Sequence, residues 1–482
     1  MIRHAIRRLL FAPLAWLTDR LGLDAIIEFT RTYKVPAALH GRIGWMYVFG
    51  MGIMAAFAIQ VVSGVALATM YVPSAGLAHE SVRYITEEVR FGAFLRGLHF
   101  FGASAMVVLV LVHMAQVFLV AAYKYPREMN WITGVVLLML TIFMAATGQM
   151  LRWDADGMWT VVVATKFASR VPFVGEPLAQ FILGGPTVGG PTLTRFYAAH
   201  VFLLPGLIIG LVSLHMYLVM HHGISEPPEG GRPVDAVTYK AYYKQLKENG
   251  IRYLPDVSYK EFVSGTAVVV AVVLLALVFG PKTPGPPPDP TMAFADPRPD
   301  WYLRWYYAFL YVKPRGLESF VMVYLPILTI VGLILLPILF REGERSPLRR
   351  PHAIAAVGVV AIVLGTLTVI GFRAPWSPAY DTQPLGPADL GVESGPVVEG
   401  AQVFFERGCQ YCHVVLGRGG LYGPDLTEVT VRISPQETAV RIVQGFRRDM
   451  PAYRDILSQE ELDALIAFLQ ALPALREEPG LR

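Results

Sequence analysis

Cysteine and charged residues are both scarce in this sequence of 482 residues. It contains two cysteines, and charged residues make up 16% of it, whereas soluble domains usually have about 25%. Two cysteines exclude a framework of several disulfides, and the shortage of charge disfavours a wholly soluble protein. The formal net charge of +4 is small and disfavours a nucleic-acid partner. Hydrophobic residues, at 54%, dominate instead.

Seven apolar stretches approach the roughly 20 residues that a helix needs to cross a membrane. We therefore predict an all-α protein built on a seven-helix transmembrane bundle. The predicted spans are residues 45–71, 92–122, 131–151, 197–219, 261–279, 317–340 and 353–372.

Composition also divides the chain into parts. After Phe372 a stretch rich in Pro and Gly is typical of a linker, and the mixed polar pattern beyond it indicates a small soluble domain. The predicted parts are an N-terminal segment (1–44), a four-helix core (45–222), a basic loop (223–260), a three-helix half (261–372), a linker (373–396) and a C-terminal domain (397–482).

The N-terminal segment begins with Arg3, Arg7 and Arg8, and an apolar run follows. A signal peptide has this pattern, but Pro13 interrupts the run and no small-residue cleavage site follows. We therefore favour an amphipathic helix on the membrane surface. Lys and Arg are more numerous in the segments on the same side of the membrane as the N-terminus than in the loops on the other side. This bias predicts that the protein lies in the inner membrane with its N-terminus in the cytoplasm. Seven crossings then place the C-terminal domain on the periplasmic side.

Both cysteines belong to one C-x-x-C-H motif, formed by Cys409, Cys412 and His413. In such a motif the two thiols bond to a c-type haem and the histidine ligates its iron. The alternatives are a chance match or a redox dithiol. A turn at 423–426 and Met450 follow in an order that resembles a small class I monohaem cytochrome c, which implies Met450 as the second axial ligand. We prefer Met450 because a structural methionine in a loop has little to pack against; the alternative is another sixth ligand.

Four histidines lie within two of the predicted spans. His99 and His113 are 14 residues apart, or roughly 21 Å along a helix, and His200 and His215 are 15 apart. A histidine inside a membrane is costly and suggests function. Four at matching depths predict two non-covalent b-type haems, the outer between His99 and His200 and the inner between His113 and His215. The alternative is a set of hydrogen-bonded core histidines.

Glycines repeat the same interval, at Gly50 and Gly64 in the first span and at Gly134 and Gly148 in the third. Because glycine permits close approach of a backbone, these positions are predicted to face the haem edges; the alternative is small-residue helix packing. Three arginines near the ends of spans are predicted to pair with haem propionates or else to anchor at the interface: Arg96, Arg195 and Arg127.

From about residue 30 to 375 the sequence resembles the cytochrome b of quinol-oxidising cytochrome bc complexes. The stretches that carry the resemblance are 60–64 (QVVSG), 126–128 (PRE), 131–135 (WITGV), 192–195 (TLTR), 223–225 (GIS) and 299–302 (PDWY). The interval between His200 and His215 is similar to the chloroplast-type branch, whose four-helix and three-helix chains are fused here.

The sequence departs from that family at several positions. Asp300 replaces the glutamate of the P-E-W-Y quinol motif. The chloroplast-type protein attaches an extra haem through a cysteine where this chain has Val48, so a covalent extra haem is not expected, and a non-covalent one stays open. Met220 stands in place of an arginine, and His221 and His222 follow, either as groups for proton uptake or as interfacial histidines.

The resemblance implies a divided electron path. Quinol binds in an outer pocket between the 152–196 loop and the 299–302 loop; one electron goes to a Rieske iron–sulfur protein on a separate chain, and the other crosses both b haems to reduce quinone on the cytoplasmic side. Asp300 is implied as the proton acceptor, a task for which a carboxylate in a dry site is suited, or else is a turn residue. Tyr302 is implied to hydrogen-bond the quinol.

The same resemblance implies the partners of the chain. They are the quinone pool, membrane lipid, the Rieske protein, a second copy in a homodimer and a downstream soluble or membrane-bound acceptor. The sequence contains no Rieske cluster motif. The tethered C-terminal domain is expected to pass electrons onward at high effective concentration.

Two other functions fit parts of the sequence. One is a dihaem anchor that links the quinone pool to another redox enzyme, which the 299–302 motif and the three-helix half disfavour. The other is a membrane-tethered electron carrier in which only the c haem turns over, which the four histidines disfavour.

Overall fold

The computed structural model describes residues 16–185, 187–288, 298–314, 316–374, 382–420, 423–445, 450 and 452–476. The chain divides into two units, Met1–Asp289 with Lys313–Gly365 and Pro290–Val312 with Thr366–Arg482. The described residues are mostly helical, which confirms the all-α prediction. The strands form two short antiparallel pairs, β1 (Lys34–Val35) with β2 (Ile251–Arg252) and β3 (Val414–Val415) with β4 (Arg418–Gly419).

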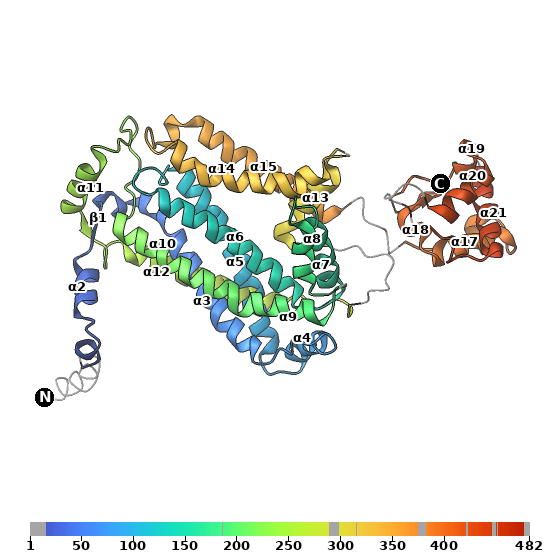
Figure 1. Ribbon diagram of the computed structural model, residues 1–482, viewed down its shortest axis with the longest axis horizontal. Coiled ribbons are helices and arrows are strands. Elements are labelled where there is room, and N and C mark those ends of the chain that lie inside the picture. The colour runs from blue at the N-terminus through green and yellow to red at the C-terminus, as the bar shows by residue number, and fades with distance from the viewer. Residues whose placement is uncertain are drawn as a thin grey trace. The chain divides into compact units, whose positions relative to one another are not determined.

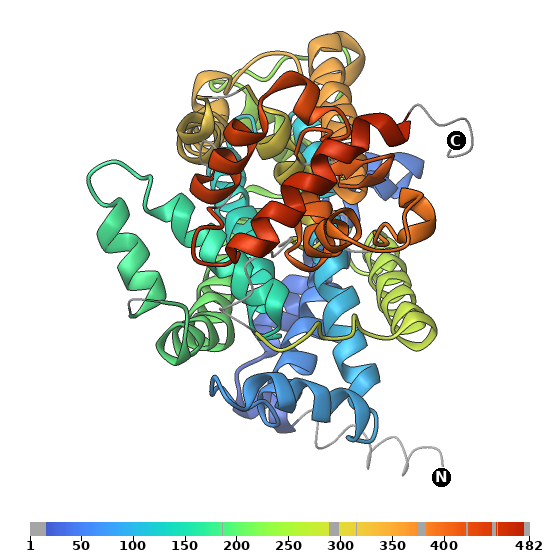
Figure 2. The same cartoon turned by 90° about the vertical axis from the view of Figure 1, so that its right-hand side faces the viewer.

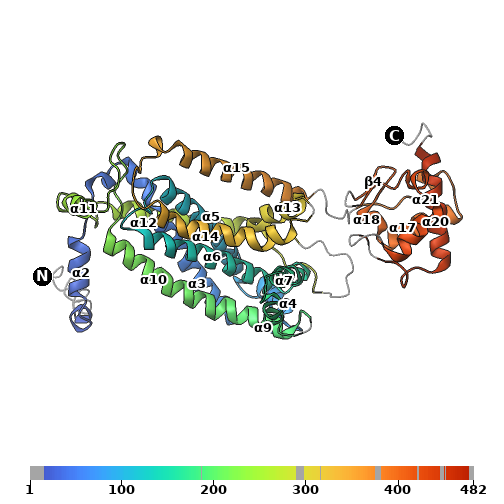
Figure 3. The same cartoon turned by 45° about the horizontal axis from the view of Figure 1, so that its top comes forward.

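Within the described residues, seven helices are long and apolar enough to cross a membrane, as predicted. Several of them run side by side in Figures 1 and 3, where α3 packs on α5 and α12, and α6 packs on α10 and α14. The helices that form these spans are α3 (Phe49–Ala68), α5 (Gly92–Leu119), α6 (Glu128–Met150), α9 (Gly190–Ala198) continued by α10 (Leu204–His222), α12 (Ser258–Phe279), α14 (Leu325–Leu339) and α15 (Pro351–Arg373).

Two spans contain a π-helical turn that ends two residues before a proline. One turn, Ala199–Leu203, joins α9 to α10 and precedes Pro205; the other, Phe320–Tyr324, opens α14 and precedes Pro326. Proline lacks an N–H and its ring clashes with the carbonyl one turn earlier, so the helix widens there. A π turn takes one more residue than an α turn, which matters for His200.

Shorter helices occupy the connections. The 152–196 loop contains α7 and α8 in addition to α9, and Asp154 caps α7 by accepting the Gly157 N–H at 2.8 Å. The helices of the connections are α2 (Asp24–Thr32), α4 (Ala78–Glu87), α7 (Ala155–Ala168), α8 (Gly175–Leu183), α11 (Tyr239–Glu248) and α13 (Arg304–Val312). Of the predicted N-terminal surface segment, residues 1–15 lie outside the described residues, and α2 is an amphipathic helix in the remainder.

Basic side chains tie helix ends to distant segments. The ammonium of Lys260 is buried and donates to the backbone carbonyls of residues 39–41 at 2.6–2.9 Å. Arg350 donates to the last carbonyls of α5, and Lys124 donates to the carbonyl of Phe340 at 2.8 Å. Carbonyls at helix ends have few partners within their own helices, so these charges add hydrogen bonds there and fix the segments together.

The C-terminal residues form a small helical fold around one apolar core. In it α17 packs against α21 (Figure 2, orange and red). The rings of Phe404 and Phe468 are centred 5.5 Å apart. Its helices are α16 (Pro387–Leu390), α17 (Pro396–Glu406), α18 (Cys409–Cys412), α19 (Val429–Arg432), α20 (Pro435–Gln444) and α21 (Gln459–Arg476). Part of the predicted linker, 375–381, lies outside the described residues.

Candidate functional site

The four predicted ligand histidines lie on two long helices. His99 and His113 are on α5, His200 is in the π turn Ala199–Leu203, and His215 is on α10. We call His99 with His200 the outer pair and His113 with His215 the inner pair, after their predicted sides of the membrane.

The two rings of the outer pair face each other. Their centroids are 6.2 Å apart and their planes are inclined by 74°. Two imidazoles that ligate one ion from opposite sides need nitrogens about 4 Å apart, twice a metal–nitrogen bond of about 2 Å, and the ring centres then lie farther apart by roughly one ring diameter. The observed separation fits a shared metal ion.

Hydroxyl groups fix the protonation of the outer pair. Ser63 Oγ is 2.9 Å from His99 Nδ1, and Thr147 Oγ1 is 3.0 Å from His200 Nδ1. Each hydroxyl donates its own proton to a carbonyl four residues earlier in its helix, so it accepts the imidazole Nδ1–H. The other ring nitrogen, Nε2, is then unprotonated and able to ligate a metal.

The inner pair is held differently. Thr133 Oγ1 is 2.8 Å from His215 Nδ1 and donates to the Met129 carbonyl at 2.9 Å. The Nδ1 atom of His113 is buried and has no hydrogen-bond partner among the described residues. Among the described residues, no ring contact joins His113 to His215, so their pairing stays a prediction.

Three of the four predicted glycines lie against these histidine rings. A side-chain carbon added at Gly148 would lie 2.7 Å from His200 Cε1. One added at Gly64 would lie 3.1 Å from His99 Cε1, and one added at Gly134 would lie 3.6 Å from His215 Cε1. Gly148 and Gly64 therefore leave room for an imidazole, which a larger residue would displace. At Gly50 nothing lies within 4 Å, so its predicted closeness to a haem edge stays a prediction.

The C-x-x-C-H motif lies on the short helix α18. His413 Nδ1 donates to the Pro424 carbonyl at 2.8 Å, which leaves Nε2 for a metal. Burial raises the pKa of the Cys409 thiol to about 12 and also raises the pKa of Cys412. A redox dithiol needs a lowered thiol pKa, so the environment disfavours that alternative. Burial lowers the pKa of His413, which favours the neutral, metal-binding form.

Met450 is half-buried and packs against the core of the C-terminal fold. The expectation that a methionine here has little to pack against is therefore wrong, because Met450 meets the apolar residues of this core. Its role as the second axial ligand stays a prediction.

Three family models match consecutive parts of the chain. Residues 35–223 match "Cytochrome b/b6/petB", residues 287–383 match "Cytochrome b(C-terminal)/b6/petD", and residues 396–469 match "Cytochrome C oxidase, cbb3-type, subunit III". Cytochrome b6 of Gloeobacter violaceus is 37% identical over 212 residues, which cover 44% of this chain and 97% of that protein. The chain belongs to the cytochrome b/b6 family.

Two further proteins are similar to this chain. The menaquinol:cytochrome c reductase cytochrome b subunit of Geobacillus thermodenitrificans is 37% identical over 216 residues, 44% of this chain and 96% of that protein. A chain of a solved structure entitled "Hyperthermophilic respiratory Complex III" is 28% identical, with a TM-score of 0.64, and the match covers 74% of this chain and 91% of that one. The chain is thus a cytochrome b with both halves fused and a cytochrome c domain at its C-terminus, as the sequence predicted.

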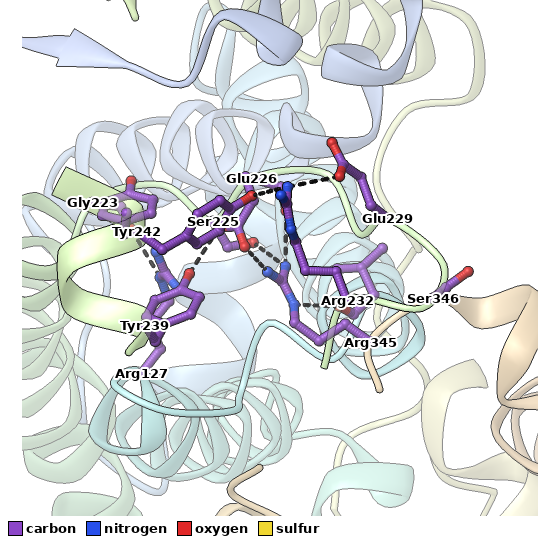
Figure 4. A network of polar contacts seen from close by, with 12 residues as sticks. Arg127, Gly223, Ser225, Glu226, Glu229, Arg232, Tyr239, Tyr242, Arg345 and Ser346 are labelled. Atoms are coloured by element: carbon purple, nitrogen blue, oxygen red, sulfur yellow. Dashed lines mark hydrogen bonds and ion pairs between the residues drawn. The ribbon is translucent and has the colours of Figure 1, made fainter. Parts of the chain in front are cut away.

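Arg127 of the cytochrome b core is enclosed by the 223–260 loop (Figure 4). It donates to the Gly223 carbonyl at 3.0 Å and to the Tyr239 hydroxyl at 2.7 Å, and its guanidinium lies 4.9 Å from the centre of the Tyr243 ring. Tyr239 in turn donates to Glu226 at 2.7 Å. These contacts fix the loop to the start of α6, and the predicted pairing with a haem propionate stays a prediction.

Glu226 connects this network to the second half of the cytochrome b. It forms a buried ion pair with Arg345, which also donates to Ser225 Oγ at 3.2 Å and to the Glu226 carbonyl at 2.8 Å. The contacts link residues on both sides of the predicted boundary between the two halves.

A pocket of about 700 Å³ adjoins the same network. Its volume lies in the usual range for small-molecule sites. It is bounded by the end of α10, by α11, and by α2 with the residues after it. Its lining residues include Tyr33, Lys34, His221, His222, Lys240 and Lys247.

Arg96 lies near the start of α5, and Arg195 lies in α9. Arg96 donates to Thr86 and to the Lys282 carbonyl, and the Arg195 guanidinium lies 5.4 Å from the Phe181 ring centre. Both arginines thus hold neighbouring segments, and their pairing with propionates stays a prediction.

The 299–302 motif forms a turn at the start of α13. The carbonyl of Asp300 accepts the Leu303 N–H at 3.0 Å, and the rings of Trp301 and Tyr302 meet edge to face at 6.0 Å. Asp300 and Tyr302 are half-buried, and their roles toward quinol stay predictions.

The sequence analysis missed the hydroxyls that hold the histidines. Their signal was available, because each one directly precedes one of the repeated glycines, at 63–64, 133–134 and 147–148. At the fourth repeat, 49–50, a phenylalanine stands before the glycine.

Proposed function

We propose that this chain is the haem-bearing core subunit of a proton-translocating quinol oxidoreductase that delivers electrons to a cytochrome c or another high-potential acceptor. Quinol is oxidised at an outer site and quinone is reduced at an inner one. The full activity needs a Rieske protein, and the subunit works as a homodimer in the inner membrane. Its N-terminus is cytoplasmic and its cytochrome c domain is periplasmic.

The observation that carries this proposal is the arrangement of the outer pair, whose rings are 6.2 Å apart with each Nδ1 on a hydroxyl. Such rings offer the remaining nitrogen to iron. The residues that would hold the haems are the outer pair, the inner pair, and Cys409, Cys412 and His413 with Met450. When bound, the haems supply one-electron transfer.

At the outer site, Asp300 accepts a proton from the quinol, and Tyr302 forms a hydrogen bond with the quinol. At the inner site, the pocket of about 700 Å³ takes the quinone. His221 and His222 line this pocket and supply protons from the cytoplasmic side. Protons released outside and taken up inside then make the reaction electrogenic.

The haem content of the purified chain tests the proposal. A pyridine haemochrome spectrum combined with haem staining of a denaturing gel is expected to give two b haems for each covalent c haem. A ratio of zero would favour the tethered carrier, and a ratio of one would mean that one histidine pair is misassigned.

Asp300→Asn is expected to slow quinol oxidation by about 100-fold, because a positioned proton acceptor contributes roughly 10²–10⁴ to a rate. All three haems should still assemble. The measurement is quinol turnover with the Rieske protein present. The matched control is Asp300→Glu, which keeps the carboxylate and should stay active. Unchanged turnover in Asp300→Asn would leave Asp300 as a turn residue alone.

A further inference from the structure

The carboxylate of Asp154 joins two connections that lie far apart in the sequence. Its side chain is fully buried. One oxygen, Oδ1, accepts the Gly157 N–H at 2.8 Å and so caps α7. The other, Oδ2, accepts the Gly285 N–H at 3.0 Å and lies 3.2 Å from Nε of Arg152. A single buried group thus holds the start of α7 to the proline-rich segment that follows α12.

Two further contacts hold the same proline-rich segment. The Ala155 N–H donates to the Pro286 carbonyl at 2.9 Å, and Nε2 of His79 in α4 lies 2.9 Å from the Gly285 carbonyl oxygen. We call the contacts of Gly285 and Pro286 with Asp154, Ala155 and His79 the outer joint. They use the N–H and the carbonyl of Gly285 and the carbonyl of Pro286, so this segment has a defined position against α7 and α4.

The outer joint lies on the part of the chain that leads into the 299–302 motif. Gly285 is 14 residues before Pro299, and the prolines at 286–288 follow it directly. Proline fixes φ, and consecutive prolines form a semi-rigid extended segment. The joint therefore sets both the place and the direction in which the chain departs toward the motif. Shortening the free part of a loop changes its closure entropy only slightly, so the joint acts mainly on position.

We propose that Asp154 is a positioning residue for quinol oxidation, which acts through the outer joint by fixing the point from which the chain enters the 299–302 motif. The carboxylate of Asp300 and the hydroxyl of Tyr302 are thereby held where they act on the quinol. Asp154 itself touches neither the quinol nor a haem. The inference rests on the proposed function, since it requires quinol to be oxidised at this motif.

Quinol turnover by the full chain with the Rieske protein tests this inference, with rates expressed per haem. Asp154→Asn keeps the cap of α7, because asparagine caps helices as well as aspartate does, but it replaces one acceptor oxygen by an NH₂ group. We expect kcat to fall by about 10- to 100-fold, since a displacement of about 1 Å at a reacting group can cost roughly 100-fold. The fall should be in kcat rather than in KM, as for groups that act in the transition state, and all haems should stay bound.

Gly285 supplies matched variants from the other side of the joint. Gly285→Ala keeps the N–H, and its added carbon would lie 3.6 Å from Asp154 Oδ2, which is an ordinary contact, so kcat should be unchanged. Gly285→Pro removes the N–H that Asp154 accepts and should lower kcat as Asp154→Asn does. The double variant should be no slower than the slower single variant, because both changes break the same hydrogen bond.

Asp156→Asn is a second control, on the same turn of α7. Asp156 also contacts the proline-rich segment, through an ion pair with Lys282 at 3.3 Å, but the two side chains are 36% and 38% exposed. Exposed ion pairs contribute little, so this variant should keep its kcat.

The inference is overturned if Asp154→Asn keeps its kcat, if Gly285→Ala loses as much as Gly285→Pro, or if the two effects add in full in the double variant. Loss of haem from both Asp154→Asn and Gly285→Pro would overturn it too, because the joint would then hold the fold as a whole. An unaltered chain that does not oxidise quinol with the Rieske protein would contradict the proposed function instead, so the two failures are distinguishable.

Discussion

Replacing His200 by leucine is expected to remove the outer b haem and to leave the inner b haem and the covalent c haem in place. His200 faces His99 at a ring separation of 6.2 Å, and leucine offers no atom that ligates iron. The pyridine haemochrome ratio of b to c haem should therefore fall from two to one. Quinol turnover should be lost with it, while haem staining at the cytochrome c domain persists.

The control lies on the same helix. His221 is at the end of α10 and lines the 700 Å³ pocket, so His221→Leu should keep both b haems. If His200→Leu also keeps two, another residue holds the outer haem and the pairing is wrong.

Replacing Glu226 by alanine is expected to destabilise the cytochrome b by about 3–5 kcal/mol, the usual cost of removing one partner of a buried ion pair. Arg345 would stay buried without its counter-charge. Tyr239 would also lose its acceptor: burial raises the pKa of Tyr239 to about 12, so its hydroxyl stays protonated and its donation to Glu226 is present at neutral pH. Thermal unfolding followed by haem absorbance measures the effect as a lower melting temperature.

Glu229→Ala is the comparison for that substitution. Glu229 pairs with Arg232 at 2.8 Å, but both side chains are more than half exposed, so the loss should be within about 1 kcal/mol. Equal melting temperatures for the two variants would mean that the buried pair does not stabilise the loop.

The features that were predictable from sequence depend on short-range signals. Membrane helices are long apolar runs, and the C-x-x-C-H motif is five consecutive residues. Membrane helices and the C-x-x-C-H motif can both be identified without knowing which other residues they contact.

The features that were missed depend on contacts between distant residues. Arg127 meets Tyr239 across 112 positions, and Arg345 meets Glu226 across 119. No local pattern shows that the 223–260 loop encloses Arg127, and its pairing with a haem propionate stays a prediction. Met450 was judged as a loop residue for the same reason, although its contacts are with the core.

The interval between His200 and His215 includes a helical irregularity that the sequence analysis did not predict. Fourteen residues bring an α-helix to within about 40° of its starting face, but fifteen overshoot it by about 60°. The π turn at Ala199–Leu203 contains His200 and takes one residue more than an α turn. Both histidines contact α6 despite the longer interval, His200 at Thr147 and His215 at Thr133.

The number of residues between two ligands on a membrane helix therefore does not by itself give the distance between them. The extra residue of α10 is absorbed in one widened turn beside Pro205, so a ligand interval that is longer by one need not mean cofactors set farther apart. When relatives with different histidine intervals are aligned, the gap belongs at this turn, and the positions on either side keep their counterparts.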